Sequence, residues 1–216
     1  MRTLRCLTLL LTLPAPLAAQ PRPPAAAPAS TLTLDELLRR FRALPGLSCR
    51  FREEKRMALL AAPLVSRGTL EYAAPGRMVR RTQSPAPSVA LIEGARLRFL
   101  DEGGEQSLDL DAMPVVRQFL ESFMALVAGD RAALERHYAP VFHAEAPTRW
   151  SLTLRPRSPA LARVFREISL AGDGVTLSTL TVREASGDES VTTFSEVDVA
   201  RRYSPAEAAR VFRLAP

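Results

Sequence analysis

Residues 63–81 read PLVSRGTLEYAAPGRMVRR, and apolar and polar side chains alternate on both sides of Pro75-Gly76. Alternation with a period of two is typical of a β-strand that has one buried face and one face in water. Proline followed by glycine favours a tight turn. The stretch therefore predicts two antiparallel strands joined by a hairpin. Their apolar face must be covered by another part of the chain.

The same period extends over most of residues 47–111 and returns after residue 149. Further alternating runs contain Leu47, Cys49 and Phe51, then Leu97 and Phe99, then Leu108 and Leu110. Glu93-Gly94 and Gly103-Gly104 lie between such runs and favour hairpin turns. Later strands are expected at 150–154, 164–170, 175–183 and 190–197. The fold class predicted is α+β, mainly β, with one curved antiparallel sheet.

Amphipathic helices supply the cover that such a sheet needs. Thr33 precedes Glu36 by three residues, a capping-box spacing, and an apolar stripe follows at helical intervals until Pro45-Gly46. Pro114 opens a second helical run that ends near Gly129, and Asp130 is placed to cap a short helix over residues 131–137. Another short turn or helix is expected from Ser204 onward.

The first thirty residues have a different character. Residues 1–19 combine two early arginines, an apolar run and Ala18-Ala19 before Gln20, which predicts a cleaved export signal. Residues 20–30 are rich in proline and alanine and are expected to form a flexible leader. Cys6 precedes the apolar run, so no lipid anchor is predicted. We expect residues 31–216 to form a single domain, soluble after export.

The chain is basic, with a formal net charge of +6 and an isoelectric point near 10.3. Its basic residues are scattered and rarely interleaved with aromatic ones, so a nucleic-acid partner is not predicted. Two interpretations stay open: a solvated basic surface, or attraction to acidic lipid headgroups or an acidic protein. Cys49 is the sole cysteine after the predicted signal and is expected to be buried.

The sequence contains no clear catalytic or metal-binding pattern. His137 and His143 lie six residues apart, a gap that matches no usual metal-ligand spacing, and no third histidine is present. No nucleophile-elbow pattern occurs. Glu53 and Glu54 are neighbours on a strand and must point to opposite faces. We predict no catalytic residues, no metal, no cofactor and no enzymatic activity.

The order of the motifs carries a resemblance to a known family. FREEK at 51–55, PLVSRGTLEYAAPGRM at 63–78 and VALIEGARLRFLDE at 89–102 are followed by ALVAGD at 125–130, RWSLTLRP at 149–156 and LTVREASGDESVTTFSEV at 180–197. In this order the chain resembles the periplasmic outer-membrane lipoprotein carriers, LolA-like proteins, as a divergent branch. The resemblance implies an unclosed β-barrel with helices acting as a lid over an apolar cavity.

The resemblance also implies a function, and this chain differs from the family at one position that matters for it. The carriers receive acyl chains from an inner-membrane donor complex and pass them to an outer-membrane acceptor, so lipid or lipoprotein cargo and a periplasmic location are expected. At the position where the family has an arginine that latches the lid, this chain has Ala74. Arg77 and Arg80 are polar candidates at the cavity mouth, where an arginine would suit an anionic headgroup.

Twelve residues are predicted to form the apolar cavity of a monomeric carrier. They are Leu70, Tyr72, Met78, Leu97, Phe99, Trp150, Leu152 and Leu154 from the sheet and Leu38, Phe41, Phe119 and Phe123 from the helices. For each of them, ordinary core packing is an equal alternative. A lipid-sensing or protein-binding module on the same scaffold, without transport, is the alternative function.

Overall fold

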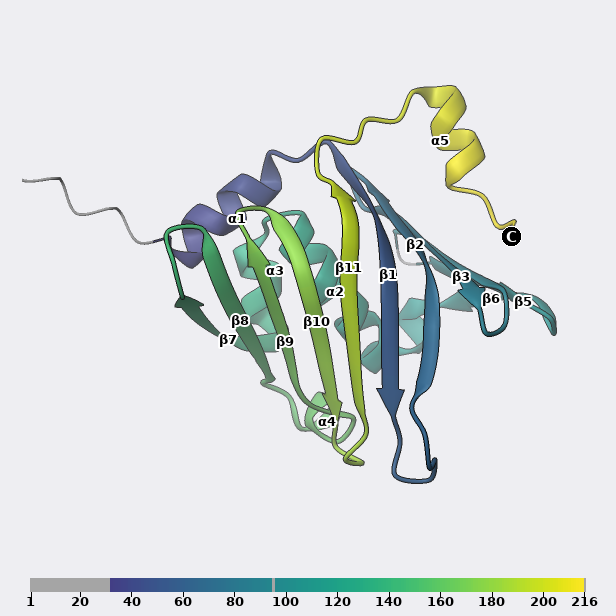
Figure 1. Ribbon diagram of the computed structural model, residues 1–216, viewed down its shortest axis with the longest axis horizontal. Helices are drawn as coiled ribbons and strands as arrows, with labels where there is room; N and C mark the ends of the chain where they lie inside the picture. Colours follow the sequence, from purple (N-terminus) through teal and green to yellow (C-terminus); the bar gives the residue numbers. More distant parts are fainter. Residues whose placement is uncertain (1–31, 95, 216) are drawn as a thin grey trace, which may run out of the picture.

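A computed structural model describes residues 32–94 and 96–215, and these form one antiparallel sheet of eleven strands with helices on both faces (Figure 1). The predicted export signal and the whole of the predicted leader lie outside these residues. The mainly β character and the curved, unclosed sheet confirm the predicted fold class.

The elements follow one another in two series of strands with helices between them. The first part contains α1 (Leu34–Arg42), β1 (Gly46–Arg56), β2 (Leu64–Ala73), β3 (Arg77–Ser84), β4 (Ser88–Glu93), β5 (Arg96–Asp101) and β6 (Gly104–Asp109). The middle contains the 3-10 helix η1 (Leu110–Ala112), α2 (Pro114–Val127) and α3 (Arg131–His137). The last part contains β7 (Tyr138–Ala144), β8 (Arg149–Pro156), α4 (Pro159–Ala162), β9 (Phe165–Asp173), β10 (Thr176–Glu184), β11 (Glu189–Asp198) and α5 (Pro205–Val211).

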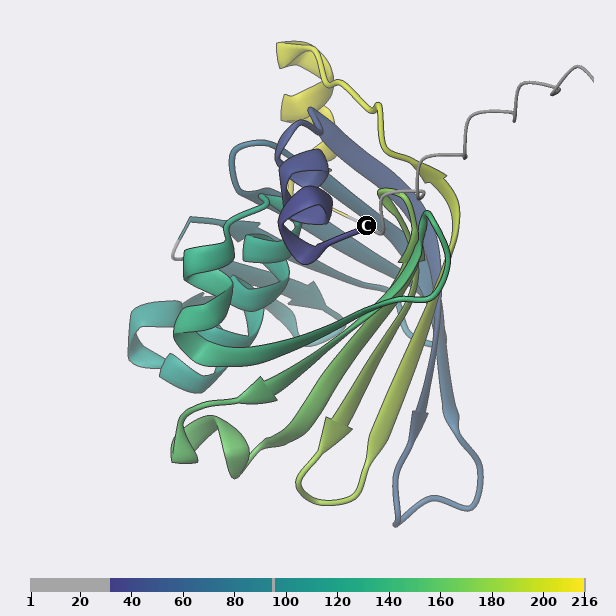
Figure 2. The same cartoon turned by 90° about the vertical axis from the view of Figure 1, so that its left-hand side faces the viewer.

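The two series of strands join at the centre of the sheet. The strand order is β6-β5-β4-β3-β2-β1-β11-β10-β9-β8-β7, so the first strand pairs with the last. The β1–β11 register runs from Ser48 opposite Asp198 to Arg56 opposite Glu189. The edge strands β6 and β7 are not neighbours in this order, which leaves the barrel open. Figure 2 shows the sheet curving around α1, α2 and α3.

The helix starts follow the local signals in the sequence. The Thr33 hydroxyl accepts a hydrogen bond from the Glu36 amide at 3.2 Å and begins α1. Asp130 accepts from the Ala133 amide at 3.0 Å and begins α3. Pro114 occupies the first turn of α2, where its missing N–H costs nothing. These predictions of helix position are confirmed.

Two stretches differ from the prediction. Strand β6 ends at Asp109, and Leu110 turns into η1 with its side chain buried, whereas the alternation predicted that the strand would continue. The Asp109 carboxylate accepts from the Asp111 amide at 2.9 Å and stabilises that turn. Strand β7 was not predicted, because Pro140 interrupts its alternation. Its position at the sheet edge tolerates proline.

The sheet has a core on each face. The concave face packs on the helices through Leu37, Phe41, Leu126 and Trp150, all at most 1% exposed. On the convex face, Val79, Val89 and Leu91 enclose Phe212, which follows α5. We refer to these two as the concave core and the convex core. None of the helices within the described residues is long and apolar enough to cross a membrane.

Candidate functional site

A cavity of about 250 Å³ lies between the concave face of the sheet and α2. Its lining is predominantly apolar and comes from both series of strands. The lining residues are Phe51, Glu53, Leu70, Met78, Arg80, Ala90, Ile92, Leu97, Leu154, Ile168, Leu170, Leu180, Thr192 and Phe194 from the sheet, and Phe119, Leu120, Ser122, Phe123, Met124 and Leu126 from α2. The cavity is therefore a gap in the concave core.

The register of the central strands builds the floor of the cavity. Phe51 lies opposite Phe194 and Glu53 opposite Thr192 on the paired strands β1 and β11. Because side chains alternate along a strand, residues two apart point to the same face, and this pair of rows faces α2. On α2, Phe119, Phe123 and Leu126 are spaced by four and three residues and share one side of the helix.

The concave face becomes more exposed along β1. Cys49 and Phe51 are 7% and 3% exposed, whereas the side chains of Glu53 and Lys55 are 25% and 30% exposed. The cavity therefore has a closed end near the start of β1, beneath α1. Its open end lies toward the β1–β2 hairpin.

A polar cluster lies at the open end. The Thr192 hydroxyl donates to Glu53 Oε2 at 3.1 Å, and Arg80 Nη2 lies 3.3 Å from the same oxygen. The Arg80 guanidinium also lies over the Phe51 ring, 4.3 Å from its centroid. We call Glu53, Arg80 and Thr192 the mouth cluster. It places a positive and a negative side chain together at the open end of the cavity.

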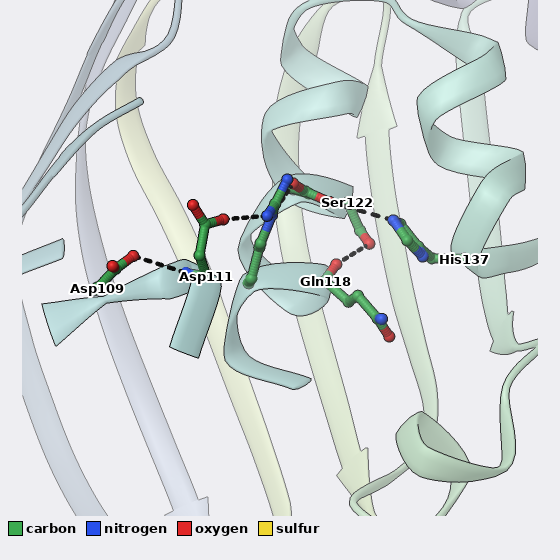
Figure 3. A network of polar contacts seen from close by, with 7 residues as sticks. Asp109, Asp111, Gln118, Ser122 and His137 are labelled. Carbon is green, nitrogen blue, oxygen red and sulfur yellow. Dashed lines mark hydrogen bonds and ion pairs between the residues drawn. The ribbon is translucent and has the colours of Figure 1, made fainter. Parts of the chain in front are cut away.

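The covering helix α2 is joined to η1 and α3 by polar contacts (Figure 3). Arg117 Nε donates to Glu121 Oε1 at 2.6 Å and also pairs with Asp111 of η1. His137, at the end of α3, lies with Nε2 3.2 Å from Glu121 Oε2. Partly exposed ion pairs contribute on the order of 0–1 kcal/mol each. They add little to the attachment of α2, which depends mainly on its buried residues Ala125, Leu126 and Val127.

One buried polar group of α2 faces the cavity. Ser122 is 1% exposed and its hydroxyl donates to the Gln118 carbonyl oxygen at 2.6 Å (Figure 3). The side-chain oxygens of Gln118 and Tyr138 are buried and make no hydrogen bond within the described part of the chain. Burial, opposed by the nearby Ser122 hydroxyl, raises the pKa of Tyr138.

The structure places half of the predicted cavity residues in the lining and half outside it. Those in the lining are Leu70, Met78, Leu97, Phe119, Phe123 and Leu154. Tyr72, Trp150, Leu152, Leu38 and Phe41 lie in the packed concave core, because α1 fills that end. The rings of Phe41 and Trp150 are 6.2 Å apart, edge to face. Phe99 shares the face of Leu97 and lies opposite Ala90, outside the lining.

The two arginines proposed for the mouth lie on opposite faces. Arg80 lines the cavity, but Arg77 points to the convex side, where it pairs with Glu93 at 2.9 Å. Its guanidinium lies 4.9 Å from the centroid of the Phe212 ring. The assignment of Arg77 to the mouth is therefore wrong, because three residues along a strand reverse the side-chain direction.

Sequence reasoning missed the contribution of β9, β10 and β11 to the cavity. Ile168, Leu170, Leu180, Thr192 and Phe194 belong to strands that were predicted but not assigned a facing side. The missing information was the long-range pairing of β1 with β11, which brings Thr192 and Phe194 to the floor. Their alternation with polar neighbours was the only local signal.

The predicted buried thiol is confirmed, and it belongs to the closed end. Cys49 is 7% exposed, and its burial raises the thiol pKa to about 12. A thiol that stays protonated at neutral pH is a poor nucleophile and metal ligand. No group of three or more His, Cys, Asp or Glu suited to a metal occurs among residues 32–94 and 96–215.

A broader groove of about 670 Å³ lies on the other side of α1, next to α3 and β7. Asp35, Arg131 and Glu135 line it, and Arg131 pairs with both carboxylates, at 2.7 and 2.8 Å. Arg157, whose Nε donates to the Tyr138 carbonyl oxygen at 2.9 Å, is the fourth charged residue of the groove and balances the second carboxylate. The apolar cavity is therefore taken as the candidate binding site.

Residues 25–212 match the family described as outer membrane lipoprotein carrier protein LolA-like. No curated protein sequence matches the chain. Similar solved structures include a LolA superfamily protein from Nitrosomonas europaea, at 12% identity and a TM-score of 0.46, with 82% of this chain and 97% of that one covered.

Two further solved structures are similar to the chain. The Pseudomonas aeruginosa MucA/MucB complex matches at 12% identity and a TM-score of 0.49, over 80% of this chain and 59% of that one. The Mycobacterium tuberculosis lipoprotein LppX matches at 9% identity and a TM-score of 0.41, over 77% and 97%.

Proposed function

Because the chain belongs to the family of outer membrane lipoprotein carrier proteins and their LolA-like relatives, we propose that it is a periplasmic carrier of acylated cargo. In this proposal the cavity receives acyl chains of a lipoprotein or another envelope lipid at an inner-membrane donor complex. The protein then passes them to an acceptor at the outer membrane. Such an exchange requires no covalent chemistry and no cofactor.

The observation that carries the proposal is the apolar gap between the sheet and α2. Its volume of about 250 Å³ lies just below the ~300–1,000 Å³ of common ligand pockets, so bulky cargo requires α2 to move outward. The partly exposed ion pair of Arg117 with Asp111 adds only on the order of 0–1 kcal/mol to the cost of that movement, and exposure of buried apolar residues such as Leu126 adds the larger share. Burial of acyl chain contributes roughly 0.8 kcal/mol per methylene, which offsets the opening.

The proposed binding residues follow from the lining. Leu70, Met78, Leu97, Phe119, Phe123 and Leu154 are proposed to contact the acyl chain. The mouth cluster is proposed to contact the headgroup. Arg80 makes one ion pair with Glu53 and no hydrogen bond among the described side chains, so its remaining N–H groups are free to bind an anionic or carbonyl oxygen. An acyl chain would then lie with its tail toward Cys49.

Native mass spectrometry of the purified mature protein, followed by lipid extraction, tests the proposal. We expect acylated species to co-purify with the unaltered protein. Leu97→Glu should reduce the bound fraction and the affinity for a fluorescent fatty acid by at least tenfold, because a charge in an apolar cavity opposes acyl binding. Phe99→Glu is the matched control, since it alters the same strand and face outside the lining.

Two results would contradict the proposal. One is a clean mass without lipid together with no binding of the fluorescent fatty acid. The other is equal loss of binding in Leu97→Glu and Phe99→Glu, which would show a general effect on the sheet. Binding that is not followed by transfer of the acylated species between donor and acceptor vesicles would favour the alternative, a lipid-sensing module without transport.

A further inference from the structure

The tip of the β1–β2 hairpin is apolar and exposed along its whole length. Residues 58–64 read ALLAAPL, and every one of them is exposed. Leu59, Leu60 and Leu64 are 97%, 48% and 43% exposed, and they are three of the five large apolar side chains exposed in the described residues. Single exposed apolar residues are common, but a contiguous apolar patch marks an interaction site.

Contacts at the base of the hairpin join it to the neighbouring β10–β11 hairpin. The Ala58 amide donates to Asp188 Oδ1 at 3.2 Å, and Lys55 Nζ pairs with Glu184 Oε1 at 2.8 Å, both on the β10–β11 hairpin. The Leu60 amide donates to the Met57 carbonyl oxygen at 3.0 Å. The backbone near the tip is thus satisfied locally while its leucines stay in water.

The tip lies at the open end of the cavity. Strand β1 carries Phe51 and Glu53 in the cavity lining and continues through Lys55 into the tip. Figures 1 and 2 show the hairpin projecting at the end of the sheet opposite to α1 and α5. Anything that receives the tip is therefore brought close to the mouth cluster.

We propose that the tip, residues 58–64, inserts into the surface of a phospholipid bilayer. The role of this insertion, to bring the cavity mouth to the membrane during loading or release, rests on the proposed function. The insertion itself does not depend on what the cavity holds. An apolar tip beside basic side chains is the composition that favours shallow burial between headgroups and acyl chains.

The composition of the hairpin favours a bilayer over a protein partner. The tip offers no polar, aromatic or arginine side chain, the types that concentrate binding energy in protein interfaces. Between Arg52 and Arg67, the hairpin carries four basic side chains and two acidic ones. Of the acidic ones, Glu53 faces the cavity and Glu54 pairs with Arg52 at 2.6 Å. Arg56, whose guanidinium lies 3.9 Å from Glu54, and Arg67 flank the tip on its two strands, where lipid phosphates would contact them.

A dye on the tip tests the insertion directly. Leu59→Cys is labelled with an environment-sensitive nitrobenzoxadiazole dye, and the buried Cys49 is expected to stay unlabelled in the folded protein. Phosphatidylcholine vesicles, with and without phosphatidylglycerol, are then added. We expect a blue-shifted and severalfold brighter emission, larger with phosphatidylglycerol. Val141→Cys, 37% exposed on edge strand β7, is the matched control and should not change.

A second variant measures the contribution of the leucines. Leu59→Ser combined with Leu60→Ser should lower co-flotation with the same vesicles by about tenfold or more, because two leucines no longer leave water. Both side chains are exposed, so the fold and fatty-acid binding in the cavity should be unchanged. An unchanged dye emission with both vesicle types, or an equal change at Val141→Cys, would overturn the proposal.

The two proposals fail differently. If the fluorescent fatty acid binds and the dye on the tip does not respond to vesicles, membrane insertion is wrong and carriage stands. If the dye responds and no acyl species binds, the tip inserts but the carrier function is wrong. A tip that fails to insert and crosslinks through Leu59→Cys to one envelope protein would show that the tip is a protein-docking site.

Discussion

The two faces of β3, β4 and β5 carry similar apolar side chains, but it is the concave one that borders the apolar cavity beneath α2. Leu91 and Ile92 are adjacent on β4 and point in opposite directions. Leu91 is 1% exposed in the convex core, whereas Ile92 is 7% exposed and lines the cavity. The difference comes from the segments that cover the two faces.

The convex face is closed by hydrogen bonds from side chains to backbone carbonyl oxygens, which join the sheet to the end of the chain. Arg81 donates to the Arg213 and Ala215 carbonyl oxygens at 3.0 and 3.3 Å, and the Tyr203 hydroxyl donates to the Leu47 carbonyl oxygen at 3.1 Å. Phe212 fills the space between them. The concave face is instead covered by α2, whose ion pairs are partly exposed. The convex cover is held by hydrogen bonds to the sheet itself, whereas the polar contacts of α2 go to η1 and α3, and apolar side chains such as Leu126 hold it on the sheet.

Shortening one apolar side chain on each face should give the largest difference in stability between them. Leu91→Ala should lower the free energy of unfolding by about 2–5 kcal/mol, because it leaves a hole in a packed core. Ile92→Ala should cost less, since a side chain that borders a void has fewer contacts to lose. Urea unfolding followed by circular dichroism gives both values.

Added fatty acid is the control for this pair. It should raise the stability of the unaltered protein and of Ile92→Ala, because a ligand that binds only the folded state stabilises it. In Leu91→Ala, fatty acid should raise the free energy of unfolding by the same amount, starting from a lower value. Equal costs for the two truncations without fatty acid would show that the concave core is packed as tightly as the convex one.

The closed end of the concave face depends on Gly129, between α2 and α3. Its φ of 64° lies in the left-handed region, and an added Cβ would lie 2.1 Å from the Leu38 carbonyl oxygen of α1. Gly129→Ala should therefore cost more than the ~1–2 kcal/mol of the backbone conformation alone. Hydrogen exchange should show faster opening of α1.

Gly94→Ala, in the β4–β5 turn, provides the matched control for Gly129→Ala. Its φ is 61°, but an added Cβ would meet nothing within 4 Å. It should show the backbone cost without the displacement of α1. If the two variants were equally stable, the close approach of α1 to Gly129 would not contribute to closing the concave face.

The sequence predicted the parts of this comparison that depend on local patterns. The strand alternation from Leu47 to Phe51, the capped start of α1 at Thr33 and the glycine turns all follow from neighbouring residues. Which apolar residues point to the concave face also follows from the sequence, because side chains at every second position of a strand share a face. Met78 and Arg80 therefore share the cavity, whereas Arg77 does not.

Whether an apolar residue lines the cavity or lies in the packed core depends on contacts between distant segments. Trp150 and Phe41 look like cavity residues in the sequence, but α1 packs against β8 and leaves no space there. The pairing of β1 with β11 places Thr192 beside Glu53, although 138 residues lie between them. No periodicity within one strand contains this information.

The thiol of Cys49 gives the smallest and most local probe of the closed end. Burial raises its pKa to about 12 from an ordinary value of 9.0, so the thiol is protonated in the folded protein at pH 8. We expect negligible alkylation by iodoacetamide at pH 8 in the native protein and rapid alkylation in urea. Because the folded-state pKa is raised, the contribution of the thiol to stability is complete below about pH 9 and is lost as the pH rises toward 12.

Cys49 lies beside Phe41 and Phe123, so alkylation in the native state also reports the opening of α1 and α2. Alkylation of the native protein as fast as in urea would mean that the concave face is no better covered at its closed end than at its mouth.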